Sequence, residues 1–469
     1  MKSSEAEGGY RPIIPLILGG AFMMQSINST FVINALPAMA KDLGHSPLDL
    51  NVTITAYLLA SAVFLPLSGW AADRFGTRTA FLVSIVAFVT SSILCGLAQT
   101  LPQLIGARLL GGAAAALMTP VGRLVLLRTA PKRELVQAMS FLTMPLLIGP
   151  VIGPPLGGAI LAFASWRWIF FVNAPIAVAA IILVLRFIPE IRAETRTRLD
   201  FRGFVLSGCG LAGLLFGLQN LGHAGVPPGV LGGILAGGLF SCVLYYFHAR
   251  GRSESLLDFS VLRVRTFYAA VVGGQFIRIM NGATPFLLTL LLQVGFGLSA
   301  LAAGLMTFAS AAAALAMKSV APPIIRRFGF RTVLLVNTGV IVATFCGYAL
   351  FTPSTSRAAI VGLLFLGGFF RSLQFTSLNT LAYVDLSPAE MSGGSTLLSM
   401  SQPLAQSLGI ALAAGVVHVS SQFLGGGVSA AAIAPAFVIV GLVPLLGLPF
   451  FWRMARDAGS EASGHRAVG

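Results

Sequence analysis

Apolar runs of about 20 residues recur along the whole chain, and each is long enough to cross ~30 Å of hydrocarbon as a helix. Polar segments separate the runs. Because a backbone cannot leave its polar groups unpaired in lipid, the pattern predicts membrane-spanning helices. We count fourteen expected spans, at residues 13–37, 51–71, 79–99, 102–127, 137–163, 167–188, 203–221, 229–248, 266–294, 299–319, 331–351, 358–382, 395–422 and 433–452.

Composition supports this interpretation. The chain has 469 residues, of which 56% are hydrophobic and 10% are charged, whereas soluble domains carry roughly 25% charged residues. The sequence therefore predicts an all-α, multi-pass membrane protein.

The net charge of +15 could suggest a nucleic-acid partner, but the positions of the charges argue against it. With a cytoplasmic N-terminus, the inner loops and tails hold 23 of the 30 Lys and Arg. The outer loops hold only Lys41, Arg167 and Arg357. This asymmetry follows the positive-inside rule, so we expect both termini in the cytoplasm and no nucleic-acid binding.

One phrase occurs twice, as DRFGTRTAFLV from Asp73 and RRFGFRTVLLV from Arg326. Both copies follow an even-numbered span, eight spans apart, which predicts a duplicated six-helix unit with two further helices inserted. The expected domains are an N-terminal six-helix bundle (1–190), a linker with two extra spans (191–265) and a C-terminal six-helix bundle (266–469). Pseudo-symmetric halves of this kind place a substrate site between them near mid-bilayer.

Several stretches resemble the major facilitator superfamily, in particular its fourteen-helix drug:proton antiporters (the EmrB/QacA-like family). GWAADRFGTR (69–78) resembles the superfamily's loop signature after helix 2, and IGPVIGPPLGG (148–158) its antiporter signature in helix 5. SWRWIFFVNAPI (165–176) and NSTFVINALP (28–37) are similar to segments of the fourteen-helix family. The resemblance covers nearly the whole chain and implies the major facilitator fold and efflux by antiport.

The loop signature implies a cytoplasmic gate made by Gly69, Asp73, Arg74, Gly76 and Arg78. Gly76 permits a tight turn, and Asp73 can accept from Arg78, from another loop cation or from a helix N-terminus. The resemblance implies that this latch holds the halves together when the cavity opens outward. The second copy has Arg326 in place of Asp73 and cannot form the same latch; the alternative is that both loops are only basic anchors.

Helix 5 carries glycines at four-residue spacing, with prolines between them. The resemblance implies an antiporter hinge here, and close packing of a neighbouring helix is the alternative. The hinge residues are Gly149, Pro150, Gly153, Pro154 and Gly157.

Inside the membrane, the expected charges are all positive. The fifteen Asp and Glu lie in tails, loops or span edges, whereas Arg278 and Arg371 lie about halfway along their spans and Arg108 about a third of the way. Arg123 is near a span end, where its side chain could reach the interface. A mid-bilayer arginine costs at least ~2.5–3.5 kcal/mol and normally faces a partner or a wet cavity.

Two interpretations of these arginines stay open. Each could brace helices by bonding free carbonyls, or Arg278 and Arg371 could form a positive site for carboxylates or phosphates. Where the drug antiporters carry an acid in helix 1, this chain has Asn28. We therefore expect a neutral or anionic substrate, with an organic acid or its metal chelate (citrate-like) as one candidate. The predicted substrate-binding residues are Gln25, Asn28, Arg278, Asn281, Arg371 and Gln374.

Proton coupling has no mid-membrane carboxylate to serve it. Arg108 matches the family's helix-4 arginine, which is implicated in coupling, and His418 is a histidine within a span. Both are candidates, with packing as the alternative for His418; the edge acids Asp42, Asp73 and Asp385 are further alternatives.

The sequence thus predicts a secondary transporter of small molecules in the bacterial inner membrane, coupled to protons and functional as a monomer in the lipid bilayer. A transporter-like sensor without turnover is the rival. We expect no enzyme activity, no cofactor and no resident metal, since no phosphate-binding loop, metal-ligand cluster or hydrolase pattern occurs.

Overall fold

The computed structural model describes residues 13–45, 47–192, 199–221, 226–250, 256–424 and 429–463. Over this part of the chain the regular structure is entirely helical. The predicted linker is described only in part, because residues 193–198, 222–225 and 251–255 lie outside these ranges.

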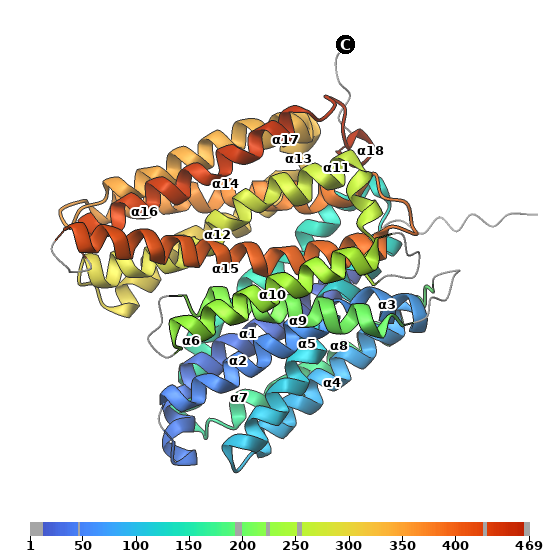
Figure 1. The fold of residues 1–469 in the computed structure, drawn as a ribbon, viewed down its shortest axis with the longest axis horizontal. Coiled ribbons are helices and arrows are strands. Elements are labelled where there is room, and N and C mark those ends of the chain that lie inside the picture. Colours follow the sequence, from blue (N-terminus) through green and yellow to red (C-terminus); the bar gives the residue numbers. More distant parts are fainter. Residues whose placement is uncertain are drawn as a thin grey trace, which may run out of the picture.

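The first eight helices form one bundle (Figure 1). They are α1 (Ile13–Leu43), α2 (Pro47–Phe64), α3 (Leu67–Phe75), α4 (Thr77–Leu97), α5 (Leu101–Thr129), α6 (Leu135–Phe163), α7 (Trp168–Phe171) and α8 (Asn173–Phe187), with the 3₁₀ turn η1 (Lys132–Glu134) before α6.

The last eight helices form the second bundle. They are α11 (Arg265–Tyr268), α12 (Gly274–Thr289), α13 (Ala300–Gly347), α14 (Arg357–Val384), α15 (Met391–Phe423), α16 (Ala430–Leu442), α17 (Leu448–Trp452) and α18 (Ser460–Ser463). Short segments connect or extend them: the 3₁₀ turns η2 (Phe259–Arg263), η5 (Tyr348–Leu350) and η6 (Val443–Gly447), and the π segments η3 (Ala269–Gly273) and η4 (Leu290–Gly295).

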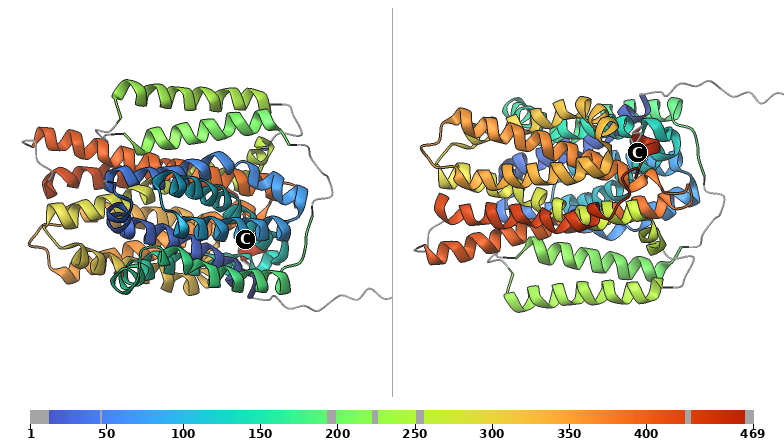
Figure 2. Two further views of the ribbon diagram at one scale, coloured as in Figure 1. Left: turned by 90° about the horizontal axis from the view of Figure 1, so that it is seen from below. Right: turned by 90° about the horizontal axis from the view of Figure 1, so that it is seen from above.

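Two helices, α9 (Phe201–Gln219) and α10 (Pro228–Ala249), lie together on one flank of the two bundles (Figure 2). α9 packs against α2 of the first bundle and α15 of the second, while α10 packs against α9. Leu211 and Leu215 of α9 are buried with Ala62 of α2 and with Leu65, the residue that follows α2. The pair therefore covers the junction between the bundles on this side.

Eleven helices of the described residues are long and apolar enough to cross a membrane, or twelve when the bent pair α2 and α3 is counted as one span. α13 is 48 residues long, which would be about 72 Å as one straight helix, more than twice the ~30 Å core. It breaks at Gly329, whose backbone is not helical (φ 74°, ψ 159°). α13 is thus two arms that turn back on each other.

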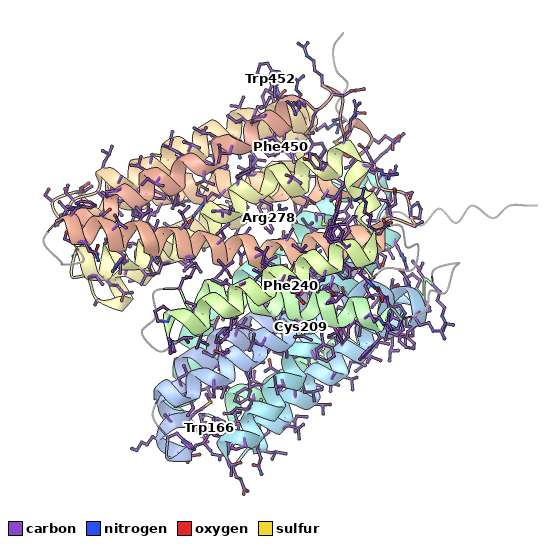
Figure 3. The ribbon with its side chains drawn as sticks, viewed as in Figure 1. Trp166, Cys209, Phe240, Arg278, Phe450 and Trp452 are labelled. Carbon is purple, nitrogen blue, oxygen red and sulfur yellow. The ribbon has the colours of Figure 1, made fainter. Side chains whose placement is uncertain are left out.

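The bundles have two ends, which we name by their charge. The basic end is where α3, α5 and α14 finish and α15 begins, and its connections carry the arginines of both repeated loops. The far end is where α1 and α15 finish. Figure 3 labels Trp166 at the far end of the first bundle and Trp452 at the basic end of the second.

The buried cores show how the bundles meet. One cluster spans both bundles at the basic end, where Val136 and Met139 of α6 and Met317 and Ile325 of α13 belong to it. At the far end each bundle has a cluster of its own, one around Phe31 in the first bundle and one around Phe437 in the second. The bundles are thus packed together at the basic end and packed separately at the far end, and Figure 1 shows them diverging toward that end.

Candidate functional site

The contact between the bundles at the basic end, which we call the seam, consists of α3 and α5 against α15 and of α6 against α13 and α14. Between α3 and α15, a Cβ on Gly69 would lie 2.6 Å from Thr396 Oγ1 and 2.9 Å from Ser392 Oγ. The Ser68 and Thr396 hydroxyls are 3.3 Å apart, and Ser395 Oγ donates to the Pro120 carbonyl at 3.0 Å. Glycine is therefore needed at position 69 for this approach.

Arg123 of α5 also crosses the seam. Its Nη1 lies 3.4 Å from Tyr383 Oη and 3.4 Å from Ser399 Oγ, both in the second bundle, and its side chain is buried. The sequence analysis allowed this arginine to reach the membrane interface, which the structure corrects. Its position near the end of a span gave no sign of a partner in the other half of the chain.

Asp73 bonds within its own bundle. Its carboxylate accepts from Arg128 Nη2 at 2.8 Å, so it joins α3 to α5 and does not itself cross the seam. The partner is another loop cation, which was one of the expected alternatives. Arg74 is exposed and Arg78 half-buried, while Gly76 makes the expected tight turn with φ 93°.

The predicted hinge lies in α6, against α1. Cβ atoms on Gly149 and Gly153 would come within 2.8 Å and 2.9 Å of the Ser26 and Thr30 side chains, so these glycines let the two helices approach closely. Gly157 is buried as well, while the side chains of Pro150 and Pro154 lie outside the described part. The close packing is thus observed, and the hinge stays a prediction.

Arg278 of α12 is 3% exposed and lies near the middle of the molecule in Figure 3. Its Nη1 donates to the Ala270 carbonyl at 3.1 Å, within the π segment that precedes α12. Its Nε and Nη2 are buried and find no acceptor among the described residues. The guanidinium is close enough to Arg123 and Tyr383 to interact with both electrostatically. Two cations from opposite bundles are therefore within electrostatic range of each other, without an ion-paired carboxylate among the described residues.

Arg371 points elsewhere. Its Nη2 donates to Ser310 Oγ of α13 at 2.7 Å and its Nε to the Gly367 carbonyl at 3.2 Å. The Arg278 guanidinium lies beside Gly274 and Leu378, and Leu378 is about 16 Å of helix rise from Gly367. The two arginines therefore do not form one anion site in this conformation, because their guanidinium groups point to opposite ends of α14.

The other predicted substrate-binding residues are dispersed. Gln374 is fully buried and uses its amide on Asn337 and Thr338 of α13. Gln25 accepts from Thr119 at 3.1 Å. Asn28 is 5% exposed with a buried Oδ1 that has no described partner, and Asn281 is half-buried.

The two proton-coupling candidates differ in setting. Arg108 is buried, donates to the Thr53 carbonyl at 3.3 Å and stacks 4.3 Å from the Tyr57 ring, so it joins α5 to α2. His418 is exposed near the far end of α15, with Gln422 3.1 Å away. The role of each in coupling stays a prediction.

Comparison with known proteins agrees with this architecture. The Major Facilitator Superfamily model matches residues 18–414. Among solved structures, the human organic anion transporter MFSD10 aligns with a TM-score of 0.67 at 17% identity, covering 94% of this chain and 99% of that one. The proton:xylose symporter XylE, bound to 6-bromo-6-deoxy-D-glucose, aligns with a TM-score of 0.64 at 14% identity, covering 96% and 98%. These structures show the fold.

Curated relatives are closer in sequence. The "Putative multidrug resistance protein MdtD" of Klebsiella pneumoniae is 37% identical over 455 residues, 95% of each chain. The protein of the same name from Salmonella newport is 38% identical over 413 residues, 87% of this chain and 86% of that one. The predicted kinship with MdtD, suggested by the MTPVGRL (118–124) and SLNTL (377–381) stretches, is thereby confirmed. The chain belongs to the Major Facilitator Superfamily and is a multi-pass membrane transporter similar to multidrug-resistance proteins, not an enzyme.

Proposed function

We propose that this chain is a secondary active efflux transporter that works by alternating access and exchanges a small molecule for protons. Counting α13 as two spans and adding α6 to the twelve gives fourteen, the number expected from the sequence. The basic end faces the cytoplasm in this proposal, with both termini on that side of the bacterial inner membrane. A single chain holds both bundles, so the unit of transport is the monomer.

The observation that carries this proposal is the unequal packing of the two ends. A core shared by both bundles closes the basic end, while separate cores at the far end leave the bundles independent there. Such an arrangement is what an outward-open transporter needs, because rocking one bundle against the other would break the seam without unfolding either far-end core.

The charges of the seam favour a neutral or anionic substrate. Arg278 has two buried donors without a described acceptor, and Arg123 faces it from the other bundle. Guanidinium groups bind carboxylates and phosphates bidentately, and a cation would be repelled by the pair. Asn28 supplies a neutral amide in helix 1. An exporter specific for an organic acid or its metal chelate is the narrower alternative.

Flux into proteoliposomes under an imposed pH gradient tests this proposal. We expect transport of citrate-like acids or neutral drugs to exceed that of ethidium-like cations, and Arg278→Gln to reduce acid flux at least tenfold. Arg357→Gln, at the exposed far end of α14, is the matched control and should leave flux unchanged. Export restricted to cations and insensitive to Arg278→Gln would contradict the substrate class. Binding without flux for every compound would favour the sensor alternative.

A further inference from the structure

Lys318 is a lysine buried within the second bundle. It lies in the first arm of α13, eleven residues before the break at Gly329, or about 16 Å of helix rise from the basic-end turn. Its side chain is 5% exposed. From the sequence it was counted with the basic-side loops, because it is the second-last residue of the expected span 299–319. The structure instead continues the helix through Pro322 and Pro323 and leaves Lys318 deep inside.

The surroundings of Lys318 compensate its charge only in part. Nζ donates to Thr376 Oγ1 of α14 at 2.7 Å and lies 5.7 Å from the Phe375 ring. No carboxylate pairs with it among the described residues. An ammonium has three donors, and a buried one without an anion is expensive. Such a group in a membrane span is a functional candidate.

The neighbouring helices offer no acid to replace that partner. α6 and α16 carry no ionisable side chain over their whole length. Arg371 of α14 is bonded to Ser310, and Glu461 of α18 pairs with Lys132. The other charged groups on adjacent elements are Arg357, at the far end of α14, and the arginines at the break of α13: Arg326, Arg327 and Arg331.

The chemistry of lysine differs from that of the other buried cations. A guanidinium keeps its proton in proteins, so the buried arginines cannot carry one across, whereas an amine can lose and regain it. The Thr376 hydroxyl suits both states, because it accepts from the ammonium and can donate to the neutral amine.

Lys318 also lies beside the part of the molecule that must move. Its neighbours Met317 and Ala321 belong to the core shared by both bundles, and its arm of α13 packs against α6 across the seam. Opening the basic end would separate α13 from α6 and so change the access of water to this amine. Access that alternates between the two sides is what a coupling group requires.

We propose that Lys318 carries the coupling proton of this transporter, with Thr376 as the residue that positions its amine. The N–H bond of the ammonium breaks with its electron pair left on Nζ, and the proton passes to water on the open side. The reverse step reloads the amine when the opposite side is open. This inference rests on the proposed function, because it assumes proton-coupled transport.

The test compares two fluxes in the same proteoliposomes. Lys318→Met removes the amine and Lys318→Arg keeps the charge but holds its proton. We expect each to lower pH-gradient-driven flux of a citrate-like acid at least tenfold, while exchange of that acid at equal pH on both sides stays within about twofold of the unmodified chain. Retained exchange shows that the variants fold. Lys41→Met, at an exposed far-end lysine, is the matched control.

A second measurement needs no substrate. Spin labels on Gln103→Cys and Gln422→Cys would report the far-end distance between the bundles, in a chain whose four native cysteines are replaced. We expect the distance distribution to change with pH and to become insensitive to pH in Lys318→Met. Gradient-driven flux that survives in either Lys318 variant, or a pH response that survives in Lys318→Met, would overturn the proposal. Absent exchange in the unmodified chain with an intact pH response would instead count against the proposed substrate.

Discussion

The loop after α3 and the loop inside α13 make the same turn but carry different charged residues before it. Gly76 and Gly329 have similar backbone angles, with φ of 93° and 74° and ψ of 150° and 159°. Before its turn, the first loop places Asp73 on Arg128. The second has the exposed Arg326 at that position.

The helices that lead into these loops differ in the same way. α3 meets α15 through Gly69 and the hydroxyls of Ser392 and Thr396, whereas the corresponding arm of α13 meets α6 in the shared apolar core. The turn is therefore present in both copies of the phrase, while the contacts of Gly69 belong to the first copy and the buried lysine belongs to the second. The two sides of the seam thus share the glycine turn and differ in the side chains that make the contact.

The largest effect is expected from Gly69→Val. Its added atoms would overlap Thr396 and Ser392, which costs about 1–3 kcal/mol and shifts the balance away from the closed seam by roughly 5- to 150-fold. Transport should fall at least tenfold, and a basic-end cysteine should react faster with a membrane-impermeant thiol reagent. Gly304→Val, where a Cβ meets nothing within 4 Å, is the control. Equal effects of the two changes would contradict close approach at Gly69.

Gly76→Ala and Gly329→Ala test whether the two turns are equivalent. Both glycines lie in a backbone region that is essentially restricted to glycine, so each change should cost about 1–3 kcal/mol of stability. Thermal unfolding in detergent measures this cost. If only one of the two variants is destabilised, the turns are not equivalent.

Asp73→Asn and Arg326→Asn test the difference between the copies. The first leaves the Arg128 guanidinium, 9% exposed, without its carboxylate, and should destabilise the chain by about 1 kcal/mol. Arg326→Asn, at an exposed position, should change the unfolding temperature less. Asp457→Asn is an exposed control at the same end. A larger loss for Arg326→Asn would contradict this ranking of the two positions.

The smallest loss of stability is expected at the far end, because the closed seam does not depend on polar contacts there. The Arg167 N–H bonded to Asp42 at 2.6 Å, with help from Trp166, lowers the pKa of that carboxyl. This ion pair therefore stabilises the folded state fully at pH values above ~3.9, the ordinary pKa of an aspartate. The stabilisation is lost as the pH falls through the lower pKa that Asp42 has in the folded state. The pair is about half exposed, so Asp42→Asn should cost below about 1 kcal/mol at pH 7 and nothing in strong acid. Unfolding temperatures measured from pH 7 to pH 3 check this.

Much of the fold follows from the sequence, because lipid imposes helices on apolar runs. The family, the helical architecture and the flanking pair α9 and α10 all agree with the spacing of spans and loops. The break of α13 at Gly329 agrees with the repeated phrase. The span count is less direct, since α13 continues through two prolines where a loop was expected to begin.

The site was harder to predict because side chains point toward the N-terminus of their helix, so two arginines at the same depth diverge when their helices run in opposite directions. Arg278 and Arg371 have similar depths in their spans, yet one guanidinium extends toward Ala270 and the other toward Gly367. Lys318 and Arg123 were placed near span ends by counting residues, and only the packing of α13 and α5 shows that they are buried. Contacts between residues 260 or more positions apart, such as Arg123 with Tyr383, leave no local signal.

Because α9 packs against both α2 and α15, the two flanks of the transporter are not equivalent. A compound that diffuses within a leaflet therefore meets α9 and α10 before it meets the junction on that flank (Figure 2). α6 and α13 meet in another part of the junction, away from this pair (Figure 2).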